Sequence, residues 1–174
     1  MDIREISLTA VIAALYATLV IVLAPVSFGP VQLRIADCII PLSALLGWPA
    51  VTGVSLGCFV GNTYFMLGAL DIVGGTVANL IAASLIFYLR RRLFPACIVG
   101  SITVGVIVGG YLWIYFPPPS IMGLNLPIWG AMIVSITLSS IIAIAGIGNL
   151  LVRALAKSGF VEVLESRGLK TYLK

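Results

Sequence analysis

The chain has 174 residues, of which 61% are hydrophobic and only 9% are charged, whereas about 25% of the residues in a typical soluble domain are charged. This composition excludes a disordered chain, which needs low hydrophobicity and high charge, and a water-soluble domain, which could not cover so much apolar surface. Histidine is absent, which removes the commonest general base and metal ligand. We therefore expect an all-α integral membrane protein that forms one domain over residues 1–174.

Charge-free stretches and helix breakers define the predicted elements. A spanning helix needs about 20 apolar residues, and three breakers divide the longer stretches: Pro25, residues 47–49 (Gly-Trp-Pro) and residues 116–119 (Phe-Pro-Pro-Pro). The sequence predicts six transmembrane helices, at about residues 7–24, 35–47, 49–67, 71–89, 95–115 and 126–151. A mixed-charge tail follows at residues 157–174.

Six spans would place both termini on one side of the membrane, and the basic residues indicate which side. Of the 10 Lys and Arg residues, only Arg34 falls on the side opposite the termini. By the positive-inside rule, both termini are predicted to be cytoplasmic in a plasma-membrane protein. In the tail, helical spacing of Phe160, Val161 and Leu164 predicts a helix that lies on the membrane surface.

Three charged residues are not explained by this topology: Arg34, Asp37 and Asp71, at the outward ends of the second and fourth helices. Charges within a membrane are costly, so they usually pair with one another or face a cavity. Arg34 and Asp37 are three residues apart and could form an ion pair on one helix face. The three residues are either a structural anchor or a polar cluster that binds a solute. The amides of Gln32 and Asn62, predicted at the same level, favour the second interpretation.

Other residues indicate close helix packing. Asn79 is predicted near mid-membrane, where an amide needs a partner, so we expect an interhelical hydrogen bond. The third helix has glycines at four-residue spacing, for which internal packing is the favoured interpretation: Gly53, Gly57 and Gly61. Four alanines of the first helix form small-residue pairs, namely Ala10 with Ala14 and Ala13 with Ala17. Such a face either packs inside the bundle or docks another membrane protein.

Catalytic functions are not favoured. Without histidine, a serine nucleophile would lack its usual base. Asp37 and Asp71 are the only acids between Glu5 and Glu162, too few for a metal-dependent transferase, and residues 74–76 lack the lysine of a phosphate-binding loop. We expect no enzyme activity, no metal site, no cofactor and no nucleic-acid partner. The cysteines, expected to be small buried hydrophobes, are Cys38, Cys58 and Cys97.

Three segments resemble motifs of the QueT family. Residues 23–37 (LAPVSFGPVQLRIAD) resemble its first-loop motif, residues 70–76 (LDIVGGT) its second motif, and residues 57–62 (GCFVGN) its Gly-rich segment ending in Asn. The resemblance covers about residues 8–92. One departure is Asp37, where the family often has Glu, so the carboxylate reaches less far.

This resemblance implies the substrate-binding subunit, or S component, of an energy-coupling factor (ECF) transporter. Such a subunit is a six-helix bundle that captures a micronutrient near the outer surface, with the loop between its first two helices as a lid. It docks a coupling subunit and two ATPase subunits through small residues of its first helix, here Ala10, Ala13, Ala14 and Ala17. For QueT relatives the implied substrates are queuosine precursors, either 7-deazaguanine bases or queuine.

The candidate site suits such a nucleobase-like ligand. A deazaguanine presents N–H donors beside a carbonyl, and a buried carboxylate can accept charge-assisted hydrogen bonds from those donors. The hypothesis is that Asp71 or Asp37 accepts hydrogen bonds from these N–H donors and that Asn62 and Gln32 complete the site. Arg34 would order the carboxylate or the lid. Two alternatives stay open. One is another micronutrient, such as a flavin, thiamine or a different nucleobase. The other is a scaffold subunit without a ligand, which has no reason to hold two acids there.

Overall fold

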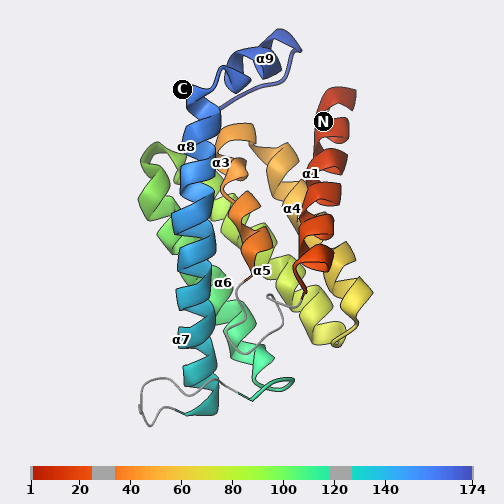
Figure 1. Cartoon of the computed structure of the whole chain (residues 1–174), viewed down its shortest axis with the longest axis vertical. Coiled ribbons are helices and arrows are strands. Elements are labelled where there is room, and N and C mark those ends of the chain that lie inside the picture. The colour runs from red at the N-terminus through yellow and green to blue at the C-terminus, as the bar shows by residue number, and fades with distance from the viewer. Residues whose placement is uncertain (1, 25–33, 118–126, 174) are drawn as a thin grey trace.

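A computed structural model of the chain describes residues 2–24, 34–117 and 127–173, and the regular structure in these ranges is helical (Figure 1). It contains α-helices, 3-10 turns (η1, η2) and one π-helical segment (η3). In chain order the elements are α1 (Ile3–Val22), η1 (Ile35–Ile39), α3 (Leu42–Leu46), α4 (Trp48–Phe65), α5 (Ala69–Tyr88), η2 (Arg90–Arg92), α6 (Leu93–Leu112), α7 (Ile128–Ser140), η3 (Ile141–Gly148), α8 (Asn149–Lys157) and α9 (Phe160–Ser166).

Four stretches of the described chain are long and apolar enough to cross a membrane, with mean hydropathies of 1.8 to 2.1. They are Ile3–Val22, Ala69–Tyr88, Arg90–Leu112 and Ile128–Lys157. Two of the predicted spans are not among them. Helix α4 has 18 residues but contains proline, glycines, threonines and asparagine, and Ile35–Leu46 is shorter. The all-helical membrane fold is confirmed, whereas the count of six spans and the orientation of the termini stay predictions.

Two helices extend beyond the predicted spans for the same physical reason. Helix α1 begins at Ile3 rather than near residue 7, because Asp2 and Glu5 form a capping box. The Asp2 carboxylate accepts a hydrogen bond from the Ile3 amide at 2.7 Å, and the Glu5 carboxylate accepts one from the Asp2 amide at 3.1 Å. The last long helix continues through α8 to Lys157 instead of ending near residue 151. Charged residues end an apolar stretch, but they do not end a helix.

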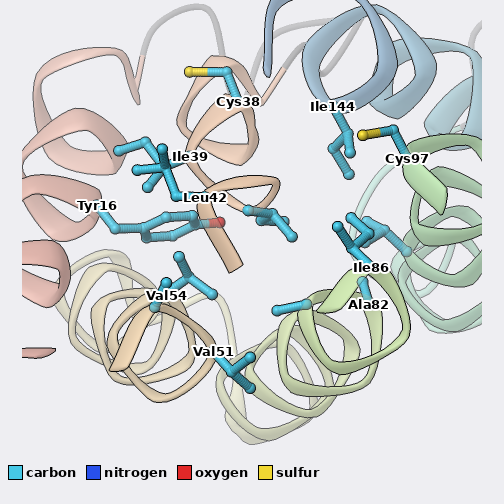
Figure 2. Close-up of a cluster of buried hydrophobic side chains, with 14 of the residues drawn as sticks. Tyr16, Cys38, Ile39, Leu42, Val51, Val54, Ala82, Ile86, Cys97 and Ile144 are labelled. Carbon is cyan, nitrogen blue, oxygen red and sulfur yellow. The ribbon is translucent and has the colours of Figure 1, made fainter. Parts of the chain in front are cut away.

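The centre of the bundle is the short segment formed by η1 and α3. Every residue from 36 to 47 is buried. Pro41 lies between the two pieces and lacks an amide proton, so the segment is a 3-10 turn followed by a short α-helix rather than one helix over residues 35–47. Side chains from three surrounding helices gather around Ile39 and Leu42 (Figure 2): Tyr16 of α1, Val51 and Val54 of α4, and Ala82 and Ile86 of α5.

Helices α1 and α4 approach closely because α4 has glycine on the shared face. A Cβ atom on Gly57 would lie 2.6 Å from the backbone oxygen of Ala13, well inside van der Waals contact. Cβ atoms on Gly53 and Gly61 would lie 2.9 Å and 2.8 Å from side-chain carbons of α1. The predicted role of these glycines in internal packing is confirmed.

The C-terminal tail packs on the protein. Val161 and Leu164 belong to the buried core, so the prediction that the apolar face of this helix lies on the membrane is wrong for these two residues. Further along, the Tyr172 amide donates to the Leu45 carbonyl at 2.9 Å, and the Tyr172 ring meets Phe87 edge-on at 5.1 Å. The start of α1 and the helix α9 lie at the same end of the bundle (Figure 1).

Candidate functional site

The structure brings four of the five predicted binding residues together. Arg34 immediately precedes η1, Asp37 lies within it, Asn62 lies in the last turn of α4, and Asp71 lies in the first turn of α5. Asp37 and Asp71 are each 1% exposed and Asn62 is fully buried. The fifth residue, Gln32, lies outside the described residues. The rule that charges within a membrane need partners therefore located a real polar cluster.

Arg34 connects the residues of this cluster. Its Nε lies 4.0 Å from Asp37 Oδ1, so the predicted ion pair is confirmed. Its Nη2 donates to Asn62 Oδ1 at 3.1 Å and to the Cys58 sulfur at 3.5 Å. The Asn62 Nδ2 in turn donates to the backbone carbonyl of Asp71 at 3.0 Å. Both ends of this amide are used, so Asn62 fixes the arginine relative to the start of α5.

Asp37 has a second partner from another helix. The hydroxyl of Tyr16, on α1, donates to Asp37 Oδ1, and the Asn79 Nδ2, on α5, donates to the Tyr16 oxygen at 2.7 Å. An amide NH₂ can only donate, so the hydroxyl proton must point to the carboxylate. The predicted interhelical hydrogen bond of Asn79 is confirmed. Tyr16 was not predicted, since one tyrosine in an apolar helix gives no signal that it faces an acid.

The Asp71 carboxylate is hydrogen-bonded through one of its two oxygens. The hydroxyl of Tyr111, on α6, donates to Asp71 Oδ1 at 3.2 Å. The other oxygen, Oδ2, is buried and has no hydrogen-bond partner among the described residues. A buried acceptor without a partner costs about 1–3 kcal/mol, and more when it is charged. The oxygen is therefore an available acceptor for an N–H group that enters the cluster.

Two adjacent glycines of α5 allow the cluster to form. A Cβ atom on Gly75 would lie 2.6 Å from Asn62 Nδ2, and one on Gly74 would lie 2.6 Å from a ring carbon of Tyr111. Any larger residue would push these side chains away from Asp71. The role of Tyr111 was not predicted. The sequence signal that could have found it is the Gly-Gly pair, because adjacent glycines in a helix indicate close approach by neighbouring groups.

The four alanines predicted to dock a partner lie on two faces of α1. Ala10 and Ala14 are exposed. Ala13 is half-buried beside Gly57 of α4, and Ala17 is buried. Internal packing thus occupies the pair Ala13 and Ala17, whereas the pair Ala10 and Ala14 faces outward.

Comparison with known proteins gives one family. A family model described as QueT transporter matches residues 6–157. This range extends beyond the resemblance at residues 8–92 and contains all four clustered residues. No curated protein and no solved structure matches the chain.

Proposed function

The chain belongs to the QueT transporter family, and on this premise we propose that it is the S component of an ECF-type importer for a queuosine precursor. The family makes the protein a membrane transporter rather than an enzyme, and it implies a transported small molecule. The proposed substrate is a 7-deazaguanine base or queuine. The proposed topology has six spans in the plasma membrane, with both termini in the cytoplasm.

The observation that carries this proposal is the unpartnered oxygen of Asp71. Asp37 already binds Arg34 and Tyr16, whereas Asp71 Oδ2 has no partner among the described residues. Of the two candidate acids, the geometry therefore favours Asp71 as the acceptor of ligand N–H groups. The Arg34 guanidinium, with five N–H donors, can in addition bind the neighbouring carbonyl of a guanine-like edge.

The remaining residues have supporting roles in this proposal. Asn62 orients Arg34 through its hydrogen bond of 3.1 Å, and Asp37 supplies the opposite charge that makes this largely enclosed arginine, 11% exposed, tolerable. Gln32, which lies outside the described residues, is proposed to complete the site. The ring of Tyr111, next to Asp71, offers a surface on which a planar base can stack.

The test is calorimetric binding of a 7-deazaguanine base to the detergent-purified chain. Asp71→Asn keeps the volume but replaces one acceptor oxygen with a donor, so we expect at least a tenfold loss of affinity. Glu162→Gln, an equivalent change of an exposed acid, should leave affinity unchanged. Full affinity in folded Asp71→Asn would refute this site. A thermal-shift comparison with guanine, a flavin and thiamine distinguishes the alternative nutrients.

We further propose that the exposed face at Ala10 and Ala14 docks the coupling subunit, which carries two ATPase subunits. A small, smooth helix face permits close approach of another membrane helix. Ala14→Leu should abolish co-purification with these subunits while ligand binding persists. Ala154→Leu, at an exposed alanine on α8, is the matched control. Retained co-purification in Ala14→Leu contradicts this docking face.

A further inference from the structure

The three consecutive arginines after α5 have different environments. The Arg90 guanidinium lies 4.6 Å from the centre of the Phe87 ring and 5.3 Å from that of Tyr172, and it donates to the Phe87 carbonyl at 2.9 Å. Arg90 thus holds the tail against the bundle. Arg91 and Arg92 are exposed, and their side chains form no hydrogen bond or ion pair with any residue in the described ranges. Two adjacent guanidinium groups are therefore available to bind an anion.

These two arginines line a cavity of about 310 Å³ at the junction of α5 and α6. Its other lining residues are apolar or aromatic: Tyr88, Leu89, Pro95, Ala96 and Val99. The cavity lies where the candidate spans Ala69–Tyr88 and Arg90–Leu112 meet. The ends of spans are expected at the level of the lipid headgroups.

We propose that this cavity binds an anionic phospholipid. Arg91 and Arg92 bind the headgroup phosphate, because a guanidinium pairs with phosphate oxygens through parallel hydrogen bonds. The apolar lining takes the adjoining part of the acyl chains. A free phosphate ion would satisfy the arginines and leave this lining exposed to water, so a lipid fits the whole cavity better.

The lipid site is separate from the nutrient site. Asp71 lies in the first turn of α5, whereas the cavity begins at Tyr88, the last residue of that helix. At 1.5 Å per residue the two are about 25 Å apart along the helix axis. Variants of one site therefore leave the other intact, and lipid binding can be measured without knowing the nutrient.

Trp48 is a suitable reporter because its ring lies 6.3 Å from that of Tyr88, which lines the cavity. In a Trp113→Phe, Trp129→Phe background it is the only tryptophan. The full chain is placed in two series of nanodiscs, in which the mole fraction of brominated phosphatidylglycerol or of brominated phosphatidylcholine is raised in equal steps. We expect phosphatidylglycerol to quench Trp48 at a lower mole fraction than phosphatidylcholine does.

Arg91→Gln with Arg92→Gln should weaken the apparent affinity for phosphatidylglycerol by about fivefold for each guanidinium. Arg91→Lys with Arg92→Lys should restore part of the loss, since lysine keeps the charge but not the parallel hydrogen bonds. The matched control is Lys157→Gln with Lys170→Gln, which removes two exposed charges outside the cavity and should leave the preference unchanged.

Three results would overturn the proposal. The first is equal quenching by the two lipids. The second is an equal loss of preference in the Lys157 and Lys170 control, which would assign the effect to general surface charge. The third is a change of Trp48 fluorescence on adding inorganic phosphate, but not chloride at the same ionic strength, without any preference for phosphatidylglycerol over phosphatidylcholine. That result would identify a free-anion site instead of a lipid site.

Discussion

Removing the Tyr16 hydroxyl tests the buried hydrogen-bond chain most directly. Tyr16→Phe keeps the ring, so it opens little new cavity, but it leaves Asp37 Oδ1 without its hydroxyl donor and Asn79 without its acceptor. Interhelical hydrogen bonds in membranes average about 0.6 kcal/mol. However, bonds to charged groups contribute about 1.5–3 kcal/mol, and a buried amide left unpaired costs about 1–3 kcal/mol. We expect the free energy of unfolding to fall by about 2–4 kcal/mol.

The assay is unfolding in mixed micelles, in which a denaturing detergent is titrated and helix content is followed by circular dichroism. Tyr64→Phe is the control because Tyr64 is 67% exposed. Asn79→Leu combined with Tyr16→Phe should cost less than the sum of the two single changes, since the double variant leaves no orphaned amide. A Tyr16→Phe loss within 0.5 kcal/mol of the control would refute the reasoning.

Two further predictions concern packing. Gly57→Ala should lower the free energy of unfolding by about 1–3 kcal/mol, because its Cβ would lie 2.6 Å from the Ala13 oxygen. Gly110→Ala has nothing within 4 Å of its Cβ and should be neutral or stabilising, so an equal loss in both contradicts this view. Tyr172→Ala should speed trypsin cleavage of the tail after α9, because it removes the ring packed on Phe87. An unchanged rate, equal to that of the exposed Val163→Ala control, contradicts the anchoring role.

Hydropathy located the helices but not their ends. Apolar stretches and breakers mark the segments because lipid contact dictates composition. Local hydrogen bonding decides where a helix begins and ends, as the N-terminus of α1 shows. Its charged first turn placed the predicted start of the span near residue 7, whereas the helix itself begins after its capping residue, Asp2. The centre of the bundle shows the same limit. After Asp37, nothing in the composition of residues 38–47 distinguishes a segment enclosed by other helices from one that faces lipid.

The site was partly predictable because charge in an apolar chain is rare. Arg34, Asp37 and Asp71 were identified by their cost in a membrane alone. Tyr16 could not be found this way, since its contact with Asp37 crosses 21 residues of sequence and its pairing with Asn79 crosses 63. A tyrosine also occurs commonly at membrane interfaces, where it needs no such partner.

Substitutions at the two buried acids should therefore have different effects on stability and on ligand affinity. Asp37 is bound by groups from other parts of the bundle, so changes around it should mainly alter stability. Asp71 has one oxygen with no partner among the described residues, so Asp71→Asn removes no hydrogen bond at that oxygen and relieves a buried charge. Its free energy of unfolding should stay the same or rise while ligand affinity falls. Such a separation of stability from binding is expected of a residue kept for its ligand rather than for the fold.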